Sequence, residues 1–277
     1  NLAIEPTTYI QRDKNEILKG IIAPHIDFMR GGVCYAYAYK EIMESDFADT
    51  YLIFGTSHAP SKSPFILCRK KFLTPFGELE VDQEFVDILE KECRFSLFED
   101  EKNHQNEHSI EFQLVFLQYL LTEKRSVKIV PVLCSSFHNI VMNGESPLSN
   151  FQIVEFIKAV KKAISLSRKR VFFIASADLA HIGPQFGDNF KIDQNILNWV
   201  EKEDINMLKA IENVNLKEFY SSVYHDGDKR KICGFPPIFT MLGIMESGVG
   251  KLLKYKKWVD PGGNAAVTFA GMAFYDK

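Results

Sequence analysis

The sequence predicts a single α/β domain with a central, mostly parallel sheet flanked by helices on both faces. Strand-like and helix-like segments alternate along the chain, as they do in successive βαβ units. The strand-like segments are short, apolar and rich in β-branched residues, which is typical of buried parallel strands. No repeat, low-complexity linker or change of composition divides the 277 residues. We therefore expect one domain over residues 1–277, with its motifs from about residue 17 onward.

Three of the predicted strands run towards a histidine. Residues 21–23 lead to His25, residues 51–55 lead to His58, and residues 170–177 lead to Asp178 and His181. In open α/β sheets the ligand crevice lies at the carboxyl ends of the strands. Neighbouring strands are only about 4.8 Å apart, so side chains at adjacent ends can reach one ion. Each histidine alone could simply cap a loop, but two at equivalent strand ends favour a metal site.

The other elements follow from periodicity and capping signals. Asp82 is expected to cap a helix that runs to residue 92, because a short acceptor satisfies free backbone N–H groups. Residues 107–121 carry an apolar stripe with helical spacing. The remaining predictions are a helix over 33–43, possible hairpin strands at 65–67 and 71–73, strands at 128–133, 252–258 and 266–275, helices at 153–166, 192–209 and 216–224 and after Cys233, and an exposed polar excursion at 139–150.

Asp178 and His181 are the candidate catalytic pair. Their i, i+3 spacing would let both face one pocket if a helical turn began there. A histidine near a metal can serve as a general base, and a carboxylate can fix its tautomer. Asp178 could also be a helix N-cap, which is compatible with that role.

Cys233 precedes a predicted helix in a Gly/Pro-rich segment. A helix N-terminus lowers the pKa of a thiol, and the thiolate binds metals or attacks substrates. A single cysteine is more often a small buried hydrophobe, so both interpretations stay open.

Glu107 and Glu111 fit an acidic first turn that complements the helix dipole, whereas His108 between them has no such explanation.

Other site classes receive less support. The segment around Ser57 resembles a nucleophile elbow, and Ser57, Asp178 and His181 occur in hydrolase order. Two prolines follow Ser57 where an elbow needs a helix, so a serine hydrolase is only a minor alternative. Gly248 and its neighbours lack the residues of a phosphate-binding loop.

Composition limits the cellular compartments and the classes of partner that we expect for this protein. The net charge of −3 gives no electrostatic footprint for nucleic acid. Five scattered cysteines without a CxxC pair support neither a zinc ribbon nor a disulfide framework. No signal-peptide pattern or membrane-length apolar run is present, so we expect a cytoplasmic protein without a membrane partner. The chain begins with asparagine rather than methionine, which leaves open that residues precede it.

Taken together, these motifs resemble the Memo family, including the type called AmmeMemoRadiSam system protein B. The resemblance rests on an ordered set, any one of which is weak alone: residues 23–25, 55–58, 74–77, 107–111, 129–133, 176–181, and Cys233-Gly234 with Pro237. That family is similar in fold to class III extradiol ring-cleaving dioxygenases, which hold non-haem iron at strand ends.

The resemblance implies His25, His58 and Cys233 as metal ligands, with Asp178 and His181 as the catalytic residues beside them. It implies a divalent metal, iron first, with zinc or copper as alternatives. His181 falls where the dioxygenases carry their base. Cysteine in place of their carboxylate ligand puts that reaction in doubt, since a thiolate is softer and more oxidisable.

Three further residues are expected to line the pocket: His108, Asp27 and Glu107. The family commonly has Ala-Gly-Tyr after the first histidine, where this chain has Ile26, Asp27 and Phe28. Asp27 could supply a carboxylate near the metal, or it could bind Arg30 or nearby backbone amides instead. We expect a dioxygenase-like redox enzyme acting on a small-molecule or peptide ligand. The alternative is a non-catalytic peptide- or protein-binding module that uses the same pocket.

Overall fold

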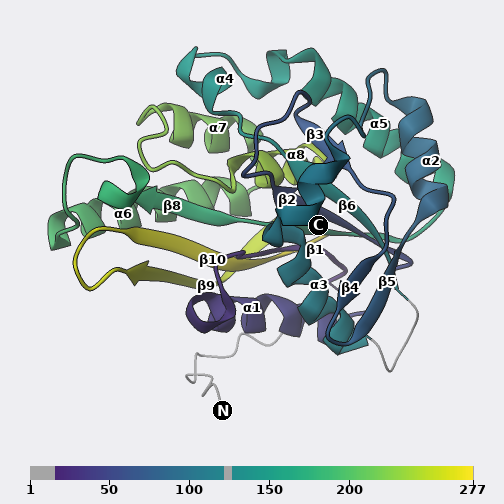
Figure 1. Cartoon of the computed structure of the whole chain (residues 1–277), viewed down its shortest axis with the longest axis horizontal. Coiled ribbons are helices and arrows are strands. Elements are labelled where there is room, and N and C mark those ends of the chain that lie inside the picture. The colour runs from purple at the N-terminus through teal and green to yellow at the C-terminus, as the bar shows by residue number, and fades with distance from the viewer. Residues whose placement is uncertain (1–15, 122–126, 277) are drawn as a thin grey trace.

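A ten-stranded mixed sheet with a parallel centre organises the chain (Figure 1). The structure is a computed structural model that describes residues 16–121 and 127–276. Four central strands are parallel in the order β1, β7, β2 and β6, namely Leu18–Ala23, Val171–Ser176, Thr50–Thr56 and Lys128–Cys134. All seven residues of β2 and all but the first of β6 are buried, as expected of strands covered on both faces. The predicted α/β fold class is confirmed.

Antiparallel strands complete the sheet on both sides of this centre. The long strand β10 (Ala266–Tyr275) pairs with β1, with β8 (Asp178–Ile182) and with β9 (Val249–Val259). On the other side, β5 (Gly77–Val81) runs parallel to β6. Two short strands, β3 (Phe65–Leu67) and β4 (Phe72–Thr74), complete the set.

The hairpin predicted from residues 65–67 and 71–73 is wrong. Strand β3 pairs antiparallel with β6, whereas β4 pairs with β5 through a turn at Pro75 and Phe76. Gly77 has a φ of +120°, a conformation that favours glycine and lets β5 follow β4 directly. The turn signal in the sequence therefore lies after the second short strand rather than between the two.

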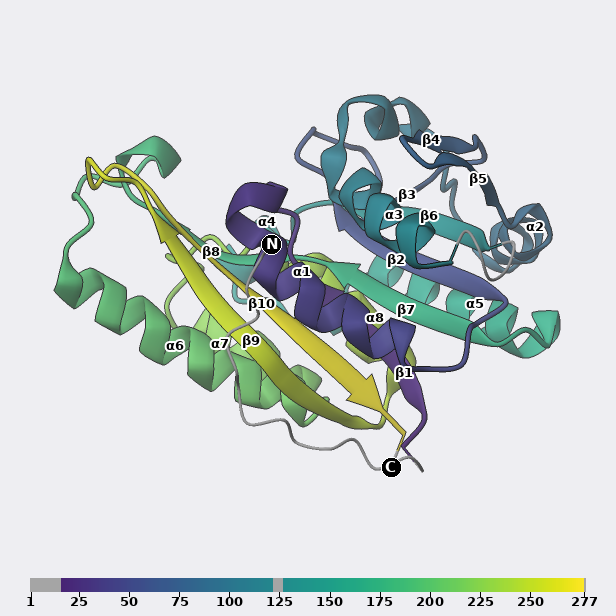
Figure 2. The same cartoon turned by 90° about the horizontal axis from the view of Figure 1, so that it is seen from below.

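Helices cover both faces of the sheet (Figure 2). One face carries α1 and α3, which are Phe28–Met43 and His108–Leu121. The other face carries α5, α6, α7 and α8, which are Phe151–Ser167, Gln194–Glu212, Leu216–Tyr224 and Phe235–Met245. Helix α2 (Gln83–Glu92) packs on α5, and its predicted cap is confirmed because the Asp82 side chain accepts a hydrogen bond from the Phe85 N–H. The predicted excursion at 139–150 contains α4 (His138–Met142) and the 3₁₀ turn η2 (Pro147–Ser149).

Asp178 and His181 lie on a strand, so the expected helical turn and helix N-cap at Asp178 are wrong. They belong to β8, which pairs antiparallel with β10. The pairing register shifts between Val267 and Phe269, so that β8 has one more residue than β10 between the paired positions on either side of the shift. Such a bulge resets the alternation of side chains along a strand. Asp178 and His181 are three residues apart, and their side chains can therefore lie on the same face of the sheet.

None of the helices in the described ranges combines the length and apolarity needed to cross a membrane.

Candidate metal centre

Three metal-ligand side chains converge from three separate segments of the fold. His25 lies two residues beyond β1, and His58 lies two residues beyond β2. Both strands flank β7 and run parallel to it, so their carboxyl ends meet at one edge of the sheet. Cys233 reaches this edge from the opposite end of the sequence, just before α8. One donor atom from each of the three lies within 4.8 Å of the others.

The donor set fits a single metal ion. Ligand bonds of about 2.0–2.3 Å place neighbouring N and S donors roughly 3.0–3.7 Å apart around a tetrahedral ion. Cys233 Sγ lies 3.3 Å from His25 Nε2, within this range. The His58 side chain is 46% exposed and can adjust to complete the set. Two imidazoles and a thiolate suit iron, zinc and copper.

His25 is buried and neutral, and its Nε2 faces Cys233. Its Nδ1 lies 3.1 Å from the carbonyl oxygen of Ser176, which calls for a proton on Nδ1 and leaves Nε2 unprotonated towards Cys233. Burial, followed by the charges of His58 and His108, lowers the pKa of His25 to about 3. The imidazole is therefore neutral at physiological pH, which is the form that binds a metal.

His58 is held by Glu107. The Glu107 carboxylate lies 2.9 Å from Nδ1 of His58 and accepts a second hydrogen bond from the His58 backbone N–H. Burial raises the pKa of Glu107, but these bonds and one from the Ser109 N–H outweigh it and lower the pKa to about 2. The bond to Glu107 in turn raises the pKa of His58. Because Glu107 occupies Nδ1, the remaining nitrogen for a metal is Nε2.

Asp178 and His181 lie beside this group. Asp178 Oδ1 accepts the backbone N–H of His25, and Oδ2 is 3.8 Å from His25 Nε2. Burial raises the pKa of Asp178. The Nδ1 of His181 lies 3.1 Å from the Leu179 carbonyl oxygen, which leaves Nε2 available. Burial lowers the pKa of His181, and the charges of His25 and His58 act in the same direction.

His108 also joins the cluster, although its spacing could not place it. Its ring stacks on His58 at 5.4 Å between centroids and meets His25 edge-on at 5.7 Å. His58, Glu107 and His108 form a second group that could hold a metal ion. That group shares His58, and its Glu107 carboxylate already accepts three N–H groups. The group of His25, His58 and Cys233 is therefore the better candidate.

Cys233 differs from the sequence-based expectation in its pKa. Burial, followed by the charge of Asp178, raises the pKa of the thiol well above its usual value. A bound cation would supply the missing positive charge, since a coordinated thiol is deprotonated.

The side chains of Asp27 and Ser57 bond to groups close to them in the sequence. Asp27 caps α1 by accepting the N–H groups of Met29 and Arg30, and it also pairs with the Arg30 side chain. This geometry matches the second of the two roles considered for Asp27. The Ser57 hydroxyl donates to the carbonyl of Ala59, and the loop that follows β2 contains no helix near this serine.

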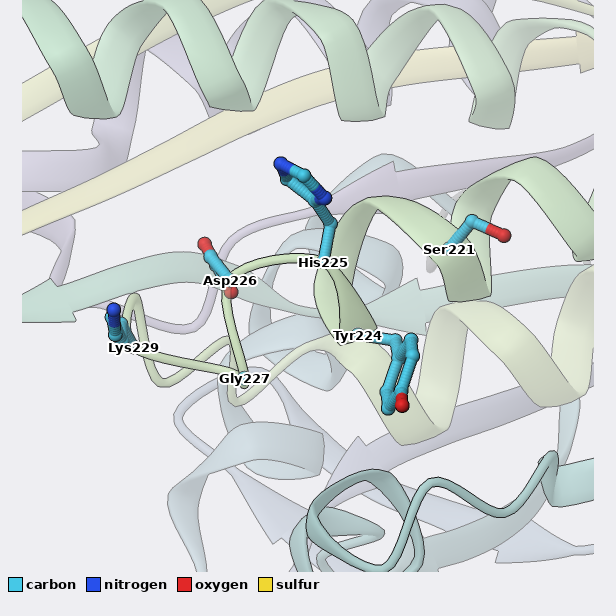
Figure 3. A pocket seen from close by; sticks show the side chains of 6 residues that line it. All are labelled: Ser221, Tyr224, His225, Asp226, Gly227 and Lys229. Carbon is cyan, nitrogen blue, oxygen red and sulfur yellow. The ribbon is translucent and has the colours of Figure 1, made fainter.

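A surface depression of about 580 Å³ lies elsewhere, at the end of α7 (Figure 3). Six residues line it, with Tyr224 and His225 pointing to opposite sides: Ser221, Tyr224, His225, Asp226, Gly227 and Lys229. None of the sequence-predicted site residues is among them. The depression borders the loop that leads to Cys233, but it contains none of the donor atoms.

Comparison with known proteins agrees with the ordered motifs. The sequence model of the family described as Memo-like protein matches residues 2–273. A MEMO1 family protein of Aquifex aeolicus is 32% identical over 260 residues, which cover 93% of this chain and 64% of that relative. MEMO1 family proteins of Methanococcoides burtonii and Methanosarcina mazei are 32% and 31% identical, with 82% and 94% of this chain and 74% and 86% of the relatives covered. The chain thus spans just under two thirds of the Aquifex relative's length.

Proposed function

The chain belongs to the Memo-like protein family, and on this premise we propose that it binds one divalent metal ion, iron, through His25, His58 and Cys233 and serves a redox reaction. The observation that carries this proposal is the convergence of the three donors, which lie within 4.8 Å of one another although 175 residues separate His58 from Cys233. Both imidazoles also have their Nδ1 engaged by a protein acceptor, which directs Nε2 to the ion.

His181 and Asp178 would have separate roles beside the metal ion. A bound iron supplies Lewis-acid and redox chemistry towards an oxygen-bearing, small-molecule substrate. His181 is kept neutral by burial and has a free Nε2, so it can accept a proton from that substrate. Asp178 holds the His25 backbone and stands next to its imidazole. The reaction would differ from that of class III extradiol dioxygenases, because a thiolate replaces their carboxylate ligand and is softer and more oxidisable.

Metal content tests the proposal. We expect protein purified anaerobically, without a metal-affinity column, to hold close to one iron per chain. His25→Ala, His58→Ala and Cys233→Ser should each lose it. His225→Ala is the matched control, since this exposed histidine lies outside the cluster and should keep the metal. Unchanged metal content in all three ligand variants would refute the proposed site.

A non-catalytic role in binding a peptide or protein is the second candidate. It is favoured by the exposed apolar residues that follow His25, since Met29 is 95% exposed and Phe28 is 37% exposed. Peptide binding that survives metal removal and the Cys233→Ser substitution would support this role. Binding that disappears with the metal would instead assign the ligand to the metal centre.

A further inference from the structure

A buried polar layer lies directly beneath the metal centre, and Gln113 is its central residue. Gln113 belongs to α3 and is fully buried. Its carboxamide N–H₂ donates to the carbonyl of Pro24 and to the hydroxyl of Ser176, both at 2.7 Å. Its carbonyl oxygen accepts the hydroxyl of Tyr39 at 3.0 Å. Both donor hydrogens and the acceptor are therefore satisfied, as a buried amide requires.

The two groups that Gln113 holds are those that orient His25. Pro24 directly precedes His25, and the Ser176 carbonyl lies 3.1 Å from His25 Nδ1. Gln113 thus fixes the backbone of Pro24 on one side of the His25 imidazole. On the other side it fixes Ser176, whose carbonyl accepts the hydrogen bond from His25 Nδ1. A rotation of His25 would have to break a network with no access to water. Such fully satisfied buried networks resist rearrangement.

The same layer reaches the other ligands through serine and threonine. The Ser176 hydroxyl donates to the carbonyl of Ser109, and the Ser109 hydroxyl donates to the carbonyl of Thr56. The Thr56 hydroxyl donates to the carbonyl of Cys233. Ser109 also donates its N–H to Glu107, the partner of His58. All three ligand segments are therefore connected to α3 by hydrogen bonds.

We propose that Gln113 is a positioning residue that sets the orientation of His25 and thereby the geometry of the metal centre. This inference rests on the proposed metal site. A hydrocarbon side chain could not replace Gln113, because the Pro24 carbonyl and the Ser176 hydroxyl would each lose a buried donor, and the Tyr39 hydroxyl would keep only the Gln113 backbone carbonyl. Glutamate has the right size, but its ionised form cannot donate to the Pro24 carbonyl.

Cobalt(II) is the probe for this role, because the energies of its d–d bands and its thiolate charge-transfer band report the coordination geometry. We expect Gln113→Leu and Gln113→Glu to bind Co²⁺ about 10–100-fold more weakly than the wild type, the range found when support of a ligand is removed. The d–d bands of the bound ion should also shift. Gln118→Leu is the matched control: Gln118 is buried on the same helix, but it bonds with Thr74 and Glu78. We expect Gln118→Leu to lower the thermal stability of the protein but to leave its Co²⁺ spectrum unchanged.

Two milder variants keep the test decisive if Gln113→Leu does not fold. Tyr39→Phe removes only the hydroxyl that donates to Gln113, and Ser176→Ala removes the hydroxyl that accepts from it. Both should shift the Co²⁺ spectrum and weaken binding in the same direction. Wild-type affinity and spectrum in folded Gln113 variants, or in both milder variants, would overturn the role of Gln113 alone. A wild-type protein that takes up no Co²⁺ would overturn the metal site, and this role with it.

Discussion

At the scale of single residues, the centre depends on acceptors that the sequence does not reveal. His25, His58 and Cys233 could be predicted, because each lies at a strand end or ahead of a helix. The sequence places Glu107 in the first turn of a helix and at the rim of the pocket, but it does not show that Glu107 accepts the N–H groups of His58. Gln113 carried no signal at all. Their partners are distant in sequence, so only the packing of α3 on the sheet brings them together.

Glu107→Gln tests the support of His58. The substitution keeps the size of the side chain but removes the charge that the His58 N–H groups face. We expect metal affinity to fall by about 10–100-fold, as for other ligands that lose a hydrogen-bonded carboxylate. Calorimetric titration with Zn²⁺ measures this, with Glu111→Gln one helical turn away as the control. Equal affinities in the two variants would contradict the assigned role of Glu107.

His104 should make the metal-free protein sensitive to acid. Its buried ring donates to the carbonyl of Ile66, and burial lowers the pKa of His104 from 6.5 to about 4. In the unfolded chain His104 therefore binds a proton below about pH 6.5, whereas in the folded chain it binds one only below about pH 4. The free energy of unfolding therefore falls as the pH falls through this window. The expected loss between pH 7 and pH 5 is about 2 kcal/mol.

Urea unfolding of wild-type and His104→Gln proteins at both pH values measures this loss. Glutamine keeps a donor for Ile66 but does not titrate, and other buried histidines contribute equally to both proteins. The substituted protein should therefore lose about 2 kcal/mol less on acidification. An identical acid response in both would exclude His104 as the source.

At the scale of elements, the parallel strands could be read from the sequence, but the position of β8 could not. The apolar run over residues 170–177 predicts the strand that the structure has at Val171–Ser176, whereas the i, i+3 spacing after it suggests a helical turn where the structure has the strand Asp178–Ile182. The segment becomes a strand because β10 pairs with it, and β10 lies about 90 residues further along the chain. Both the pairing and its bulge are tertiary features, which local periodicity does not encode.

Gly234 tests the contact between this strand and the loop of Cys233. A Cβ at this position would lie 2.4 Å from the Asp178 carbonyl oxygen and 2.6 Å from the Ala177 Cβ. Gly234→Ala should therefore push the Cys233 loop away from β8, at a cost of about 1–3 kcal/mol in stability. Metal affinity should fall as well, because Cys233 is the adjacent residue.

Gly144→Ala provides the matched comparison. Gly144 lies beyond α4 with a φ of +73°, so alanine there is strained by about 1 kcal/mol without touching the centre. Thermal unfolding and Zn²⁺ titration of both variants separate the two effects. Should Gly234→Ala bind Zn²⁺ as tightly as Gly144→Ala, the close packing of the Cys233 loop would not control the site.

At the scale of the whole molecule, one sheet positions two of the three proposed ligands together with Asp178 and His181. His25 follows β1, His58 follows β2, and Asp178 and His181 belong to β8. Because one sheet and one large hydrophobic core connect these elements, we expect the protein without metal to unfold in one cooperative transition. Coincident urea transitions followed by far-ultraviolet circular dichroism and by tryptophan fluorescence would support one domain. Two separated transitions would contradict it.

The most direct measurement is anomalous X-ray diffraction at the iron absorption edge from crystals of anaerobically purified protein. We expect one anomalous peak at about 2.0–2.3 Å from His25 Nε2, His58 Nε2 and Cys233 Sγ. Density at that position would establish the three donors as ligands. A peak on other residues, or no peak in protein supplied with iron, would contradict the central claim.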